Sequence, residues 1–306
     1  MAPQVPVDSC EEIGPIGDLL RPAQGESMTL IVTAGNAEYA VMAADTRLSW
    51  KGVLVDDASA KIAQLRFFDG VLISAYTGLA RWGTFETRMF LLDALYKVAE
   101  PWKKTEEVLS LLRENITKEF MTNAELKLLA PAERKLSIVF AGFIDQTCIT
   151  VLISNFEDHI GPFTQVADEF VLTKIRATDP SGSWCGTFGQ RSAVTVDDIA
   201  ELNRLIMSHN SPLPVKGKCH AMVLKAGPRS GGSVGPNILT ATLPRGQSAT
   251  SWYSTEGHQE SIIMPDNFHA LAAGGSAMMI RDVKLHIPNL TSKRPDRRGR
   301  KGKHQP

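Results

Sequence analysis

The stretch from Met28 to Lys61 contains a hydroxyl, a carboxylate and an amine at equal spacing. Thr29 precedes Asp45 by 16 residues and Lys61 by 32. Two apolar runs, 29–33 and 39–44, are separated by a short polar turn, as in a β-hairpin. The second run ends abruptly in Asp45-Thr46-Arg47, and a buried strand that ends in an acid and a base is a typical way to build a site. The spacing therefore predicts that these three groups converge.

The elements around this hairpin follow the order strands, two helices, strands, helix, strand. Helices are predicted where apolar residues recur every three or four positions, and strands where short β-rich runs are bounded by turn residues. The predicted helices are 85–98, 105–123 and 196–209, and the further strands are 53–55, 71–76, 136–140, 148–154, 170–175, 184–188 and 220–225. A doubly wound parallel fold would alternate strand and helix throughout. The order favours an α+β fold, a four-layer αββα sandwich of two antiparallel sheets flanked by helices.

The chain divides by composition into four parts. Residues 1–27 contain several prolines and glycines and are expected to be a flexible extension or propeptide. Residues 28–226 are the predicted folded domain. Residues 227–290 are a C-terminal extension of unclear role, with a glycine-rich loop at 227–236, short strands at 237–243 and 260–264, and a weak helix at 266–281. Residues 291–306 hold seven Lys and Arg against one Asp and are expected to be a disordered basic tail.

The bulk composition limits the class of partner. The chain has 43% hydrophobic and 22% charged residues and a formal net charge of zero, so its charge gives no argument for binding nucleic acid or a membrane. The basic tail lacks interleaved aromatic residues, so a solubilising terminus is favoured over a non-specific nucleic-acid tether. No apolar run approaches the roughly 20 residues of a membrane span.

Cysteine usage indicates the compartment. Cys10, Cys148, Cys185 and Cys219 are scattered without a CxxC pair, which argues against a zinc site and a disulfide framework and fits a reducing environment. The N-terminus also lacks the basic and apolar regions of a signal peptide. We therefore expect a cytoplasmic protein without a metal or other cofactor.

Four short segments carry a resemblance to a known family. They are Thr29-Leu30-Ile31-Val32, Ala43-Ala44-Asp45-Thr46-Arg47, Ala60-Lys61-Ile62 and Ala75-Tyr76-Thr77-Gly78-Leu79-Ala80. In this order, with these intervals, the stretch from Met28 to about Lys225 resembles the proteasome-type threonine peptidases of the N-terminal nucleophile hydrolases, and the proteasome β-subunits in particular.

The resemblance implies a role for each matching residue. Thr29 would be the nucleophile, with its own freed α-amine as general base. Lys61 would lower the pKa of that hydroxyl and amine, and Asp45 would pair with Lys61 and orient it. Gly78 matches the oxyanion-hole position, where a backbone N–H faces the developing charge. The positions that form the walls of the site and pair with a peptide or amide substrate are matched by Arg47 and Ser49.

Each of these residues also has an ordinary structural interpretation. Asp45 and Arg47 form a strand-end ion pair in that view, and Lys61 is a solvated surface lysine. Gly78 is then a strand-to-helix turn glycine and Thr29 a strand threonine.

The sequence departs from the family pattern at two places. Met28 stands where self-cleaving precursors carry glycine, and one hypothesis is that translation begins at Met28 and that removal of this methionine exposes Thr29. The resemblance also implies an aspartate and a serine after the third helix, and the segment matched to them, 208–217, has serines but no aspartate. Two alternatives to a threonine peptidase follow: a catalytically silent structural subunit or scaffold of the same fold, and a non-peptidase amidase. The resemblance also implies a ring-like homo-oligomer.

Overall fold

The structure is a computed structural model that describes residues 29–50, 53–56, 59, 61–100, 102–176, 182–208, 210–255 and 258–262. Two antiparallel sheets form its centre. Sheet 1 contains, in spatial order, β12 (Trp184–Gly189), β1 (Leu30–Gly35), β2 (Tyr39–Asp45), β13 (Ile238–Pro244), β14 (Thr250–Thr255) and β15 (His258–Ile262). Sheet 2 contains β11 (Val171–Arg176), β10 (Thr147–Ser154), β9 (Leu136–Ile144), β6 (Gly70–Gly78) and β5 (Ala63–Arg66). Two short ribbons pair β3 (Leu48–Trp50) with β4 (Val53–Asp56) and β7 (Arg81–Trp82) with β8 (Phe85–Glu86).

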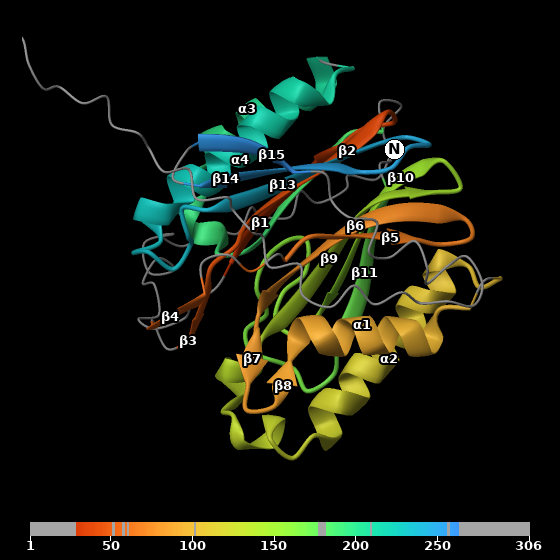
Figure 1. Cartoon of the computed structure of the whole chain (residues 1–306), viewed down its shortest axis with the longest axis vertical. Helices are drawn as coiled ribbons and strands as arrows, with labels where there is room; N and C mark the ends of the chain where they lie inside the picture. Colours follow the sequence, from red (N-terminus) through yellow and green to blue (C-terminus); the bar gives the residue numbers. More distant parts are fainter. Residues whose placement is uncertain are drawn as a thin grey trace, which may run out of the picture.

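Two pairs of helices cover the outer faces of the sheets (Figure 1). α1 (Thr87–Val98) and α2 (Thr105–Thr122) lie on sheet 2, and α3 (Val196–Ser208) and α4 (Pro212–Arg229) lie on sheet 1. Short 3₁₀ turns occur at Leu126–Leu128, Pro131–Arg134 and Arg191–Ala193. The layer order is helices, sheet, sheet, helices, which confirms the predicted αββα sandwich.

Three apolar layers hold the sandwich together. One lies between α1, α2 and sheet 2, one between the two sheets, and one between sheet 1 and α3, α4. In β1, Leu30 and Val32 face the helices whereas Ile31 faces sheet 2. Since side chains alternate across a strand, a central strand in such a sandwich is buried on both faces. This is why the first hairpin reads as two continuous apolar runs.

Most predicted elements are confirmed within a few residues, but the strand predicted at 220–225 is wrong. This segment lies inside α4, which also includes the first residues of the predicted loop at 227–236. Val215, Cys219, Met222, Val223 and Ala226 are buried against sheet 1. Their spacing of three and four residues is helical. Short runs of apolar residues read alike in a strand and in a buried helix, and the packing on sheet 1 decided between them.

The described part of the chain beyond residue 227 completes sheet 1. β13 pairs with β2 along its length, from Ile238 opposite Asp45 to Pro244 opposite Tyr39. The strands expected near 237–243 and 260–264 correspond to β13 and to β15. The weak helix at 266–281, the extension 1–27 and the basic tail 291–306 lie outside the described residues.

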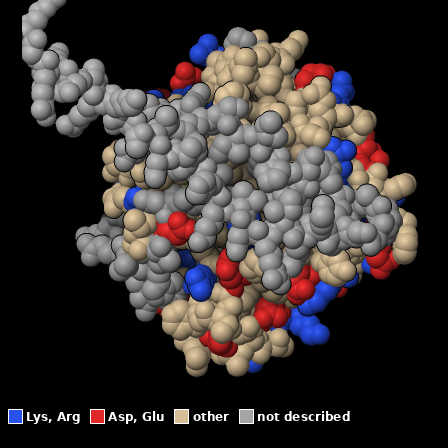
Figure 2. All heavy atoms as spheres, viewed as in Figure 1, with Lys and Arg blue, Asp and Glu red and all other residues tan. Residues whose placement is uncertain are grey.

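The surface seen in Figure 2 carries both signs of charge. Lys, Arg, Asp and Glu side chains are interspersed over the lower part of this face, around α1 and α2. Within the described ranges, no helix is both long enough and apolar enough to cross a membrane.

Substitutions in α4 test the corrected assignment. Met222 is 1% exposed, whereas its near neighbour Leu224 is 37% exposed. We expect Met222→Ala to lower the free energy of unfolding by about 2–5 kcal/mol, because a cavity opens against sheet 1. Leu224→Ala should change it by only about 0.5 kcal/mol. Urea unfolding of both variants gives the comparison, and equal losses would contradict the packing described.

Candidate active site

The register of the first hairpin brings Thr29 and Asp45 together. β1 and β2 pair antiparallel with Ile31 opposite Ala44, so the chain before Leu30 lies beside the end of β2. The Leu30 N–H donates to Asp45 Oδ1 at 3.0 Å. Thr29 is 7% exposed and Asp45 is fully buried. The hydroxyl and the carboxylate that the spacing singled out therefore share one end of the hairpin.

Lys61 completes the cluster from the segment before β5. Its Nζ donates to Thr29 Oγ1 and to the Arg47 carbonyl, and it lies 3.7 Å from Asp45 Oδ2. The residue is only 4% exposed, so it is not the solvated surface lysine of the ordinary interpretation. An ammonium group in contact with a hydroxyl stabilises the alkoxide form of that hydroxyl.

The carboxylate of Asp45 is surrounded by donors. Besides Leu30 N–H, it accepts from the N–H groups of Arg47 and Gly235, both at 3.2 Å from Oδ2. Burial raises the pKa of this carboxyl, and the Lys61 charge and the three backbone N–H groups oppose that rise. A buried carboxylate that accepts from three backbone N–H groups is positioned rigidly, and it fixes the ammonium beside it in turn.

The loop between α4 and β13 forms one wall of this cluster, which the sequence did not predict. Arg47 Nη1 donates to the Gly232 carbonyl at 2.7 Å, and Thr46 N–H donates to the Asn237 carbonyl at 3.0 Å. These contacts come after α4, whereas the segment 208–217, in which an aspartate was sought, forms the junction of α3 and α4. The loop Ser230–Asn237 contains serines but no acidic residue. Ser49 lies in β3, and its side chain is outside the described residues.

The carbonyl of Thr29 is held from both sheets. Thr77 Oγ1, at the end of β6 in sheet 2, donates to it at 2.9 Å, and the N–H of Gln190, just after β12 in sheet 1, donates at 3.2 Å. Gly78 follows Thr77 with φ of 100°. A Cβ at Gly78 would lie 2.2 Å from the Lys135 carbonyl oxygen. Only glycine fits at position 78. Gly78 directly follows Thr77, whose hydroxyl holds the Thr29 carbonyl.

Other nucleophiles and metal sites are less well supported. Burial raises the pKa of the Cys148 and Cys185 thiols to about 11, so neither is a thiolate at neutral pH. Among the residues that the structure describes, no group of three His, Cys, Asp or Glu side chains could hold a metal ion.

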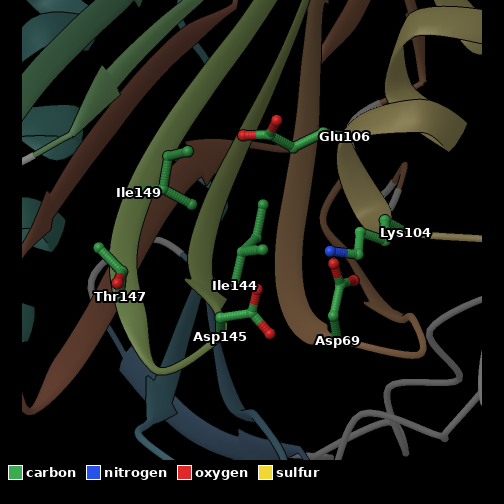
Figure 3. A pocket seen from close by; sticks show the side chains of 7 residues that line it. All are labelled: Asp69, Lys104, Glu106, Ile144, Asp145, Thr147 and Ile149. Carbon is green, nitrogen blue, oxygen red and sulfur yellow. The ribbon is translucent and has the colours of Figure 1, made fainter.

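A polar cavity of about 240 Å³ lies at the opposite end of sheet 2 (Figure 3). Its lining residues are Asp69, Lys104, Glu106, Ile144, Asp145, Thr147 and Ile149. Asp69 precedes β6, and Thr77 and Gly78 end that strand. The full length of β6 therefore separates this cavity from Thr29, and it is not part of the same site.

Comparisons with known proteins agree with this architecture. No model of a known protein family and no curated protein matches the sequence. Among solved structures, the helical assembly of the Anbu complex from Pseudomonas aeruginosa is similar, with a TM-score of 0.52 and 14% identity over 75% of this chain and 88% of that chain. Anbu (ancestral beta-subunit) from Yersinia bercovieri gives a TM-score of 0.47 at 15% identity, over 77% of this chain and 88% of that one. Eukaryotic HslV from Trypanosoma brucei gives 0.43 at 12% identity, over 71% and 99%.

The chain has the proteasome-like N-terminal nucleophile hydrolase fold. At 14% identity the likeness to the Pseudomonas structure shows the fold alone. What the site does must therefore be argued from Thr29, Asp45 and Lys61 themselves.

Removal of Lys61 tests the buried charge cluster. We expect Lys61→Met to lower the free energy of unfolding by about 3–5 kcal/mol at pH 7, because Asp45 then stays buried without its cation. The loss should shrink when Asp45→Asn is added. It should also shrink as the pH falls from 7 toward 5. Without the Lys61 charge, which opposes the rise, the pKa of buried Asp45 lies higher in the variant than in the unmodified protein, so the folded variant takes up the proton first. Chemical unfolding at the two pH values measures both effects. A pH-independent loss would contradict the pairing.

Proposed function

We propose that this protein is a threonine-type amide hydrolase, acting on peptide or related amide bonds, in which Thr29 is the nucleophile. The observation that supports it is the contact of the Lys61 ammonium with Thr29 Oγ1 in a buried cluster backed by Asp45. A surface threonine has no such neighbour, and a hydroxyl becomes a useful nucleophile when its pKa is lowered and a base is at hand.

The reaction follows from the groups present. Thr29 Oγ1 attacks the amide carbonyl carbon, and its proton passes to the α-amine of the same residue, directly or through water. An α-amine has a pKa of about 7.7–8.0 and is partly neutral at cellular pH. The Lys61 charge favours the deprotonated form of both groups. The amine then returns the proton to the leaving nitrogen, and water hydrolyses the resulting ester by the same route.

Three further residues have roles in this proposal. The backbone N–H of Gly78 is the proposed oxyanion donor, next to Thr77, which already holds the Thr29 carbonyl. Arg47 fastens the loop after α4 through Gly232 and so shapes one wall of the site. Ser49, in β3, is proposed to pair with the substrate backbone.

The proposal requires a free α-amine on Thr29. A start at Met28 followed by removal of that methionine produces it, and so does cleavage before Thr29. Intact-mass measurement of the protein purified from its own cells distinguishes these routes from a chain that retains residues 1–28. A native species that begins at Met1 or Ala2 excludes this chemistry.

A catalytically silent subunit of the same fold is the second candidate. The observation in its favour is the loop Ser230–Asn237, which reaches Asp45 and Arg47 but contains no carboxylate to stabilise an ammonium on Thr29. A non-peptidase amidase would keep the Thr29 chemistry and differ only in substrate.

Assembly of several copies belongs to the proposal as well, and the similar structure from Pseudomonas aeruginosa is a helical assembly. We expect light scattering after size exclusion to give a mass several times that of one chain. A single-chain mass over a wide concentration range would contradict assembly.

Labelling tests the nucleophile directly. A chain prepared to begin at Thr29 should turn over small peptide amides and take up one equivalent of a peptide vinyl sulfone. Thr29→Ala should lose turnover and labelling by at least about 10³-fold, because it removes the hydroxyl that Lys61 contacts. Thr33→Ala is the matched control, since Thr33 is also buried in the same strand region but bonds to the Gly186 carbonyl. If the unmodified chain with an exposed Thr29 shows neither turnover nor labelling, the silent subunit is the better description.

A further inference from the structure

Glu157 is a buried carboxylate that the chemistry above does not use. It follows the end of β10 and is 2% exposed. Its two oxygens accept from the Gly189 N–H at 3.1 and 3.2 Å, and Oε2 accepts from Arg191 Nε at 2.9 Å. Burial raises the pKa of this carboxyl, while the Arg191 charge and hydrogen bonds from Ser137 and Gly189 oppose the rise. Buried carboxylates are rare without a reason, so what this one holds in place is informative.

The backbone of Gly189 lies in close contact with the carbonyl of Thr29, the proposed nucleophile. It pairs with Leu30 at the end of β12 and has φ of 77°. A Cβ there would lie 2.1 Å from the Thr29 carbonyl oxygen and 2.6 Å from Thr77 Oγ1. The next residue, Gln190, donates its N–H to that same carbonyl. Glu157 therefore fixes one peptide N–H at Gly189, and the following N–H is aimed at Thr29.

The contact of the Gln190 N–H with the Thr29 carbonyl matters because Thr29 is the first residue of the proposed mature chain. A first residue has no preceding peptide, so its backbone is held only through its own carbonyl and the N–H that follows, in addition to the contact of its side chain with Lys61. The Thr29 carbonyl is held by Thr77 and Gln190, and the Leu30 N–H by Asp45. The contact from Gln190 is set by Glu157 through Gly189.

The carboxylate is itself held firmly. The guanidinium of Arg191 donates to the carbonyls of Asp158 and His159 as well as to Glu157. It also lies over the Phe188 ring, 5.2 Å from its centre. The Glu157 N–H donates to Ser154 Oγ, which in turn accepts from Ser137. Glu157 thus joins the loop after β10 in sheet 2 to the end of β12 in sheet 1.

We propose that Glu157, clamped by Arg191, is a positioning residue that orients Thr29 for attack by fixing the Gly189–Gln190 backbone against the Thr29 carbonyl. The expected effect of Glu157 on the rate rests on the proposed function. Its expected effect on the Gly189–Gln190 backbone rests only on the contacts described above. Glu157 adds a second acidic residue, besides Asp45, to the surroundings of Thr29, whereas the loop Ser230–Asn237 contains none.

Two substitutions separate the acceptor from the charge. Glu157→Gln keeps a carbonyl oxygen that can accept from Gly189 but loses the charge that faces Arg191. Glu157→Ala removes the acceptor. In the chain prepared to begin at Thr29 and continue to Pro306, we expect kcat for a small peptide amide to fall on the order of 10²-fold in the Ala variant, since a small misplacement of a reacting group has this effect. The Gln variant should lose less than about tenfold, and KM should change less than about threefold in both.

Asp69→Ala is the matched control. Asp69 also accepts from a backbone N–H, that of Thr105 at 2.8 Å, but it lies at the far end of β6 beside the cavity of Figure 3. Its loss should lower stability without lowering kcat. If Glu157→Ala and Asp69→Ala reduce kcat equally, or if Glu157→Ala stays within about twofold of the unmodified chain, the inference is overturned.

Amide hydrogen exchange provides a readout that does not depend on turnover. Peptides covering 29–34 and 186–193 should exchange at least about tenfold faster in Glu157→Ala, or in Glu157→Leu, which also lacks the acceptor, if the Ala variant does not fold, and should be unchanged in Asp69→Ala. Unchanged exchange in a folded variant that lacks the acceptor contradicts the positioning role. An unmodified chain without activity would contradict the proposed function alone, because the exchange comparison still decides whether Glu157 holds this backbone.

Discussion

A buried carboxylate at the end of β2 constrains the site more than any other group. Asp45 is fully buried, so its charge must be satisfied by partners from outside its own strand. Those partners come from β1 (Leu30), the segment before β5 (Lys61) and the loop after α4 (Gly235). Segments far apart in the chain must therefore meet around Asp45. Because Lys61 pairs with Asp45, its ammonium also contacts the Thr29 hydroxyl.

The sandwich makes this convergence possible. Apolar layers on both faces of each sheet exclude water from the end of the first hairpin, which strengthens the interaction between the Lys61 ammonium and its neighbours. The Thr29 carbonyl is held by Thr77 from one sheet and Gln190 from the other. Thr29 thus lies where the two sheets meet, and its geometry depends on how they stack.

Backbone conformation contributes as much as side chains around Thr29. Gly78 and Gly189 both adopt positive φ, and in both cases a Cβ would collide with a backbone carbonyl. Such positions exclude other residues for steric reasons, whatever their role in catalysis. At Gly189 this lets the end of β12 approach Thr29 closely, and the Gln190 N–H then holds the Thr29 carbonyl together with the Thr77 hydroxyl.

The local features of this protein could be predicted from the order and spacing of its residues. The intervals between Thr29, Asp45 and Lys61, the two apolar runs of the hairpin and the helical stripes of α1, α2 and α3 were sufficient to predict the αββα class and the charge cluster. These signals are local, or depend on the register of one hairpin, and so they survive without knowledge of the packing. The ordinary interpretation of Lys61 as a surface residue was excluded only by its burial.

Which distant segments surround the site could not be predicted, because it depends on how the sheets and helices pack. The run 220–225 was predicted as a strand because its few apolar residues fit either period, and its packing on sheet 1 makes it part of α4. The glycine-rich stretch 227–236 was predicted only as a loop in an extension of unclear role, yet Gly232 and Gly235 contact Arg47 and Asp45. Glu157 and Arg191 are 34 residues apart, with no motif to join them. Such contacts are made across two stacked sheets, and no spacing along the chain encodes that stacking.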